Sequence, residues 1–251
     1  MGLLVNAVGY LRSVLVTIPL VYLATVLFGS VSLVVSMFDA RGNAQHAVAR
    51  SWARVLLWLC GVRVAVKGLE HIEPGKTYVF TANHQSYMDI PVAFAHLPAN
   101  FRIMAKASLF HIPFLGWHLR RSGHLSVARG NPRRAARSLL EAATHIGKGM
   151  PVFVFPEGGR TPDGKMHEFK PGVFLLAIKA QAPVAPVTLR GTFEVLPMHS
   201  WHIRPARVEM TLHAPIPTTG MHSDAAPALA AQVRALLARD LHENNSTPGS
   251  N

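Results

Sequence analysis

The chain has 251 residues, enough for one α/β domain with a sizeable core and a short appendage. Hydrophobic residues make up 49% and charged residues 15%, against about 25% charged in ordinary soluble domains; this excludes a disordered chain and favours contact with a membrane. The formal net charge of +12 suits an anionic partner, whereas the low aromatic content of 8% argues against a nucleic-acid partner read by base stacking.

The first predicted element is a long apolar segment. Residues 13–38 carry no charge over 26 positions, more than the roughly 20 residues that cross a bilayer as a helix. We interpret it as a membrane-inserted helix rather than a cleaved signal peptide or a buried core helix, although Pro19 and Gly29 can break it into a shallower element. Basic residues follow from Arg41 onward and only Arg12 precedes, which predicts a cell inner membrane protein with its bulk on the cytoplasmic face.

A second, amphipathic run covers residues 45–60. Trp52 lies there between Arg50 and Arg54, a combination that suits the lipid interface. The two runs together predict either a spanning helix or a helical hairpin that dips into one leaflet, and the sequence leaves both open. Residues 1–60 are therefore expected to form a membrane anchor. The single cysteine, Cys60, excludes an internal disulfide.

Beyond residue 60, short β-rich runs alternate with helical ones. Strands are predicted at 62–66, 77–82, 101–105, 124–127, 152–155, 184–189 and 207–212. Helices are predicted at 91–96, 132–146, 172–180 and 224–242. This alternation predicts an α/β fold with a mixed sheet flanked by helices. We expect residues 61–243 to form the catalytic domain and residues 244–251 a disordered tail.

The sharpest motif is Asn-His-Gln-Ser-Tyr-Met-Asp at 83–89, directly after a predicted strand. On a regular helix, residues five apart point about 140° away from each other, so His84 and Asp89 meet only if the chain turns between them. At such a strand-to-helix turn, Asp89 can hold the His84 imidazole in one tautomer and leave the other nitrogen as a base. A loop histidine there is expected to carry little packing. The alternative is an ordinary histidine in a surface loop.

A second motif, Phe-Pro-Glu-Gly-Gly-Arg-Thr-Pro-Asp-Gly at 155–164, follows another apolar strand. Ligands bind at the carboxyl end of strands in open α/β sheets. Gly158 allows a ligand to approach the backbone, Arg160 offers a planar fork for phosphate, and Glu157 can bond a hydroxyl. Lys106 and Arg129 also follow predicted strands. Each of these features also has a plain structural reading, as a glycine-rich hairpin or a solvated charge.

In this order and spacing, the blocks NHQSYMD, GHLSVAR, FPEGGRT and APVAPV resemble the glycerolipid acyltransferases, specifically the 1-acylglycerol-3-phosphate acyltransferases. The resemblance covers roughly residues 60–215. It implies that His84 is the catalytic base and Asp89 its partner. It also implies that the substrate's glycerol-phosphate is bound by Lys106, Arg129, Glu157, Gly158 and Arg160.

The resemblance implies transfer of a fatty acyl group from acyl-CoA or acyl-carrier protein to the free hydroxyl of lysophosphatidic acid, at a membrane phospholipid surface. The thioester is already activated, so the reaction requires no enzyme nucleophile. We also expect it to need neither a metal nor a cofactor. Two alternatives remain at this stage. One is a related acyltransferase that acts on another lyso-lipid, such as lyso-ornithine lipid, or on glycerol 3-phosphate. The other is a non-catalytic basic membrane-binding protein.

Overall fold

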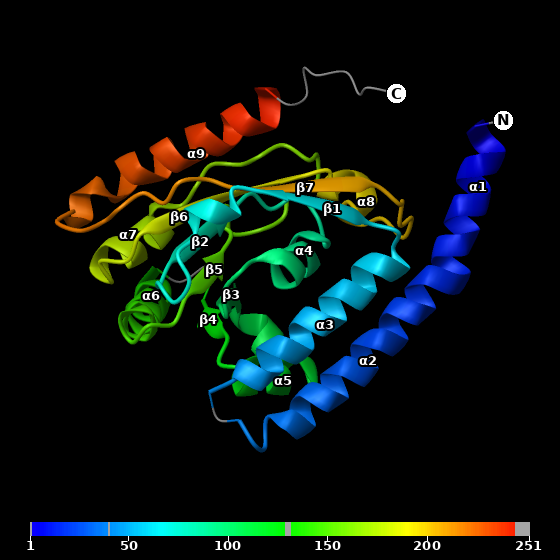
Figure 1. Ribbon diagram of the computed structural model, residues 1–251, viewed down its shortest axis with the longest axis horizontal. Helices are drawn as coiled ribbons and strands as arrows, with labels where there is room; N and C mark the ends of the chain where they lie inside the picture. The colour runs from blue at the N-terminus through cyan, green and yellow to red at the C-terminus, as the bar shows by residue number, and fades with distance from the viewer. Residues whose placement is uncertain (1, 40, 129–131, 244–251) are drawn as a thin grey trace.

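A computed structural model describes residues 2–39, 41–128 and 132–243, and the predicted tail at 244–251 lies outside them. Its centre is a seven-stranded mixed sheet of order β1-β7-β6-β2-β5-β3-β4, in which only the β6–β7 pair is antiparallel (Figure 1). All seven predicted strands are present, and the predicted fold class is confirmed. The strands are β1 (Arg63–Lys67), β2 (Val79–Ala82), β3 (Arg102–Lys106), β4 (Leu125–Val127), β5 (Val152–Val154), β6 (Val184–Arg190) and β7 (Arg207–Leu212).

Two hydrophobic cores lie on opposite faces of the sheet, because successive strand side chains point to opposite faces. Phe80 and Phe153 pack into one core with the helices at Asn43–Leu59 (α3) and Asp89–His96 (α4). Their strand neighbours Val79, Val152 and Val154 pack into the other core with the helices at Pro132–Gly147 (α6), Pro171–Lys179 (α7) and Ala226–Glu243 (α9). The central strands are buried on both faces, which explains why they read as continuous apolar runs.

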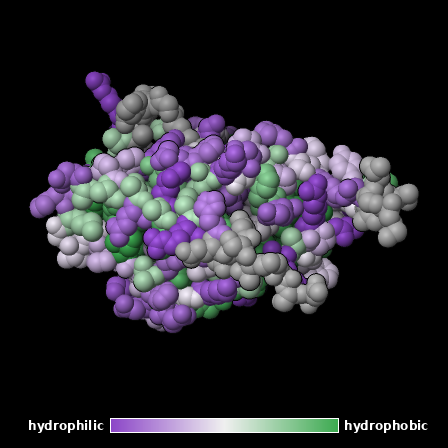
Figure 2. Space-filling model, turned by 90° about the horizontal axis from the view of Figure 1, so that it is seen from above, coloured by the Kyte–Doolittle hydropathy of each residue, from purple (hydrophilic) through white to green (hydrophobic). Residues whose placement is uncertain are grey.

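Helices cover both faces (Figure 1). One side carries α3 (Asn43–Leu59) and α4 (Asp89–His96); the other carries α6 (Pro132–Gly147), α7 (Pro171–Lys179) and α9 (Ala226–Glu243). The sequence did not predict the short helices α5 (Leu115–Arg121) and α8 (Thr192–Val195), or the 3₁₀ turns at Leu69–His71, Ala107–His111 and Ser223–Ala225. The face seen in Figure 2, on the side of α9, has hydrophilic residues spread across it, as expected for a surface in water.

The N-terminal segment is one continuous helical run, so neither Pro19 nor Gly29 breaks it. It consists of α1 (Gly2–Arg12), a π-helical turn (Ser13–Thr17) and α2 (Ile18–Val35). The wider π turn precedes Pro19, whose ring lacks an N–H and crowds the preceding turn of an α-helix. Within residues 6–35, an 18-residue window has a mean hydropathy of 2.2, and only 6% of that window is buried against the rest of the protein. This outward apolar surface indicates membrane association.

Helices α2 and α3 run side by side as an antiparallel hairpin (Figure 1). Trp52 of α3 donates its indole N–H to the Thr25 hydroxyl of α2 at 3.1 Å. Gly29 of α2 leaves room for Phe114, because a Cβ at this position would lie 2.7 Å from the Phe114 ring. The inner face of α3 belongs to the same core as the sheet. The hairpin is therefore packed onto the α/β fold, and the division at residue 60 stays a prediction.

Candidate active site

The two motifs lie side by side at one edge of the sheet. The loop at 83–88 follows β2, and the loop at 155–161 follows β5, the strand next to β2. Because β2 and β5 are parallel, their carboxyl ends meet at the same edge. This is the edge at which open α/β sheets bind ligands.

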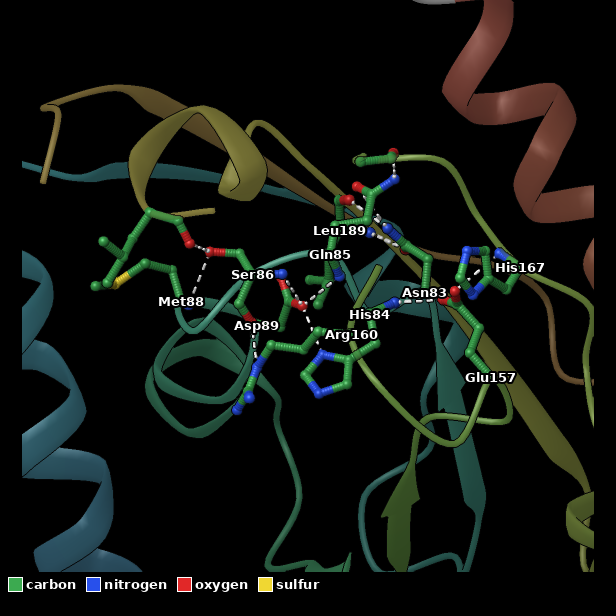
Figure 3. Close-up of polar contacts among 12 residues, drawn as sticks. Asn83, His84, Gln85, Ser86, Met88, Asp89, Glu157, Arg160, His167 and Leu189 are labelled. Atoms are coloured by element: carbon green, nitrogen blue, oxygen red, sulfur yellow. Dashed lines mark hydrogen bonds and ion pairs between the residues drawn. The ribbon is translucent and has the colours of Figure 1, made fainter. Parts of the chain in front are cut away.

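The structure brings His84 and Asp89 together across a tight strand-to-helix turn. His84 lies two residues past β2, and Asp89 is the first residue of α4. The Nδ1 atom of His84 is 2.7 Å from Oδ2 of Asp89. This oxygen also accepts the backbone N–H groups of Gln85 at 2.8 Å and Ser86 at 2.9 Å (Figure 3). A fully buried carboxylate at a helix N-terminus, held by these donors, fixes the imidazole and turns its other nitrogen, Nε2, away from the carboxylate.

His84 is buried rather than loosely exposed. Its side chain is 10% exposed, and its ring stacks on Phe155 at 3.7 Å between centroids, with 11° between the planes. The main chain of His84 is fixed as well: its N–H donates to Oε1 of Glu157 at 2.6 Å, and its carbonyl accepts the N–H of Thr161 at 3.1 Å. The expectation that this histidine carries little packing is wrong.

Glu157 holds the main chain of His84 and His167 through hydrogen bonds. One carboxylate oxygen accepts the His84 N–H, and the other accepts the N–H of His167 at 2.9 Å. Burial raises the pKa of Glu157 to about 7, although both backbone hydrogen bonds act in the opposite direction. The resemblance implied substrate binding for this residue, whereas in the structure both oxygens bond to backbone N–H groups.

Because the pKa of Glu157 is higher in the folded state than its ordinary 4.5, its contribution to stability is full below about pH 4.5. That contribution is lost as the pH rises to about 7. We expect the free energy of unfolding of the wild type to fall by about 3 kcal/mol more than that of Glu157→Gln over this range. Denaturant titrations of the detergent-solubilised proteins at several pH values measure it. Glu168→Gln, at an exposed neighbour, is the control, and identical profiles for wild type and Glu157→Gln would contradict the prediction.

Arg160 lies beside the His–Asp pair, on the other side from Glu157 (Figure 3). Its Nε–H donates to the Ser86 carbonyl at 3.2 Å, and its guanidinium lies 4.1 Å from the centre of the Tyr87 ring. No carboxylate in the described residues forms an ion pair with it. The guanidinium is therefore a half-buried, positioned cation next to the candidate base.

The remaining predicted site residues differ in their placement. Gly158 adopts φ +78°, and a Cβ at this position would lie 2.7 Å from Nζ of Lys170, so this backbone conformation and this approach suit glycine. Lys106 is exposed at the end of β3, at the same sheet edge as His84 and without an ion pair in the described residues. Arg129 lies outside the described residues.

Two polar residues that were not predicted from the sequence shape this loop. Asn83 exchanges two hydrogen bonds with the backbone of Leu189 on β6, at 2.7 and 2.8 Å. The Ser86 hydroxyl donates to the Leu196 carbonyl at 2.7 Å. Both residues belong to the first motif, and their proximity to His84 was the only available signal. Most polar side chains of the motif therefore hold the loop that carries His84.

An apolar cavity of about 310 Å³ lies between α2, α3, α4 and α5. Ile90, the residue after Asp89, contributes to its wall, as does Phe94 one turn further along α4. Phe28 and Gly29 line the side of the cavity that is formed by α2, the helix with the outward apolar surface. The cavity therefore lies between the candidate base and the membrane-associated helix.

Comparisons with known proteins agree on one family. The sequence model described as Acyltransferase matches residues 63–190. A 1-acyl-sn-glycerol-3-phosphate acyltransferase of Chlamydomonas reinhardtii is 36% identical over 74% of this chain, and a chloroplastic one of Arabidopsis thaliana is 32% identical over 82%. The chain spans only 56% and 57% of the length of these two relatives. A Saccharomyces cerevisiae protein of the same name is 31% identical over 96% of this chain and 80% of its own length.

A solved structure has the same fold over its full length. The crystal structure of the 1-acyl-sn-glycerophosphate acyltransferase PlsC from Thermotoga maritima superposes with a TM-score of 0.79 and 27% identity, covering 100% of both chains. The likeness includes the N-terminal helices, because the whole of this chain is covered.

Proposed function

The chain belongs to the acyltransferase family, and on this premise we propose that it is an O-acyltransferase that converts 1-acylglycerol 3-phosphate into phosphatidic acid. The acyl donor is the thioester of acyl-CoA or acyl-carrier protein. The observation that carries the proposal is the buried His84–Asp89 pair at 2.7 Å. It supplies a general base in a fixed orientation, which is sufficient because transfer from a thioester requires no enzyme nucleophile.

In the proposed mechanism His84 acts as a general base. The acceptor hydroxyl loses its proton to Nε2 while its oxygen bonds to the thioester carbonyl carbon. The tetrahedral intermediate then collapses, the carbon–sulfur bond breaks, and the imidazolium returns the proton to the leaving thiolate. Asp89 stabilises the imidazolium without accepting the proton, as in serine-protease triads. Glu157 and Thr161 hold the His84 main chain, so the base does not need to reorganise during the reaction.

The cavity is the proposed site of the acyl chain. It is largely apolar, it is lined by Ile90, the residue that follows Asp89 in the chain, and it is also lined by α2 of the membrane-associated segment. A fatty chain buried there leaves its thioester near His84 and transfers apolar area out of water.

The N-terminal run is proposed to lie in one leaflet rather than cross the membrane. Ser13 bonds to the backbone of Ile203 at 3.0 Å, and Ser32 bonds to Nδ1 of His118 at 3.0 Å. These two serines are about 29 Å apart along the helix, close to the full thickness of a bilayer core. A crossing helix would put Ile203 and His118 of one folded domain on opposite sides. We place the domain on the cytoplasmic face of the inner membrane, as the charge asymmetry predicts.

Arg160 is the proposed ligand of the acceptor phosphate. We expect thiol release from acyl-CoA to depend on lysophosphatidic acid, and Arg160→Ala to raise the KM for this acceptor about 10- to 100-fold with little change in kcat. The assay uses detergent-solubilised protein with a thiol reagent.

The control for this prediction is Arg239→Ala, a basic residue on α9. Equal KM values for wild type and Arg160→Ala would remove Arg160 from the phosphate role. Faster release with glycerol 3-phosphate or lyso-ornithine lipid would reassign the acceptor, and release without any acceptor would indicate a thioesterase.

A further inference from the structure

The end of the cavity remote from His84 contains a hydrogen-bond donor. His124 contributes to the lining and is 9% exposed. Its Nδ1 atom accepts the backbone N–H of Ile103 at 3.2 Å. The proton of a neutral imidazole must then be on Nε2, which has no acceptor in the described residues. Burial holds the pKa of His124 well below its usual value, so the ring is neutral.

Further polar groups surround this donor. His118, whose ring centroid is 6.0 Å from that of His124, also contributes to the cavity wall and is paired with the Ser32 hydroxyl. Gln45, which is fully buried, lines a separate small hollow with both histidines, and this hollow has no room for a ligand. Neither its amide oxygen nor its amide nitrogen has a partner in the described residues. The Nε2–H group of His124, by contrast, borders the apolar cavity without an acceptor in the described residues. Burying such a donor without a partner is unfavourable, so a bound polar group would stabilise this end of the cavity.

The sheet register gives the distance to the base. Phe80, Phe153 and Ile103 are at one level across β2, β5 and β3, and His124 is level with Ile103 because the next residues, Met104 and Leu125, pair. His84 is four residues beyond Phe80, about 13 Å along the strands, and β2 is three strand spacings from β4, about 14 Å. A long fatty chain whose thioester is at His84 reaches this end.

Resting on the proposed function, we propose that the enzyme accepts acyl chains that carry a hydroxyl group near the end remote from the thioester. The Nε2–H group of His124 donates to the oxygen of the chain. The hydroxyl hydrogen of the chain is donated to Oγ of Ser32, which also lines the cavity. In a wholly apolar cavity the same hydroxyl would be buried without partners and rejected.

The test compares ω-hydroxylated and plain acyl-CoA donors of matched length, from dodecanoyl to octadecanoyl, with lysophosphatidic acid as acceptor. For the wild type we expect kcat/KM for the best hydroxylated donor to be within about threefold of that for its plain counterpart. An unpartnered hydroxyl would reduce it by more than about tenfold. A disadvantage of that size at every length overturns the inference while leaving the proposed function intact.

Two variants separate the donor from the fold. His124→Asn retains an acceptor for the Ile103 N–H but removes the Nε2–H group, and we expect the hydroxylated-to-plain ratio to fall about tenfold. His46→Gln is the control, because Nε2 of His46 accepts the Phe101 N–H at 3.3 Å and His46 does not line the apolar cavity. An unchanged ratio in His124→Asn, or an equal fall in both variants, overturns the inference. Failure to transfer even plain chains overturns the proposed function and the inference with it.

Discussion

We expect the replacement of His84 by alanine to lower acyl transfer by at least about 10³-fold, because the variant would lack the group that is proposed to remove the hydroxyl proton. The fold survives, since the main-chain bonds from Glu157 and Thr161 do not involve the imidazole. The ring nevertheless packs on Phe155, so the variant loses about 1–2 kcal/mol of stability. Acceptor-dependent thiol release measures the activity, and thermal unfolding measures the stability.

The matched control is His167→Ala. The side chain of His167 is exposed, and this residue contributes only its backbone N–H to Glu157. We expect its activity to stay within about twofold of wild type. Transfer by a folded His84→Ala protein at more than a tenth of the wild-type rate would refute the assignment of the base.

The second large effect is expected at Asp89, and its size depends on a detail of the geometry. All three hydrogen bonds that Asp89 accepts go to Oδ2. In Asp89→Asn, an amide oxygen in this position keeps both backbone N–H groups and the Nδ1–H of His84, and therefore keeps the tautomer. The negative charge is lost, and with it the stabilisation of the imidazolium. We expect kcat to fall about 10²-fold and the KM for lysophosphatidic acid to stay the same.

Asp89→Ala gives the contrasting result. It leaves buried backbone donors without an acceptor, which destabilises the loop and frees the imidazole to turn. We expect a fall in kcat of about 10⁴-fold and a lower melting temperature. Equal losses in Asp89→Asn and Asp89→Ala would show that the carboxylate acts through its charge alone, against the role of Oδ2 as a structural acceptor.

The fold was largely predictable because the strands are short apolar runs bounded by turn residues. Pro151 and Pro156 flank β5, for example, and each limits the strand to its buried residues. The His84–Asp89 contact was predictable as well. The motif lies between a predicted strand and a predicted helix, and a turn there brings residues five positions apart together.

The support of the site was not predictable from the sequence. Glu157 acts on a backbone N–H that is 73 positions away in the chain, and a backbone group has no sequence signature. Helix α5, which walls the cavity, is short and contains Gly116. A Cβ at Gly116 would lie only 2.2 Å from the Phe110 carbonyl oxygen, so this glycine is required by packing while it weakens the helical pattern.

The packing of α2 limits how a water-soluble form of this protein can be engineered. Removing the first 35 residues would delete Thr25, Phe28, Gly29 and Ser32 from the cavity wall, together with the apolar surface. Leu23 and Leu27, by contrast, are 64% and 59% exposed and point away from the domain. Polar replacements at such outward positions reduce the need for detergent and keep the cavity intact. For this fold, solubility has to be gained by resurfacing the helix rather than by truncating it.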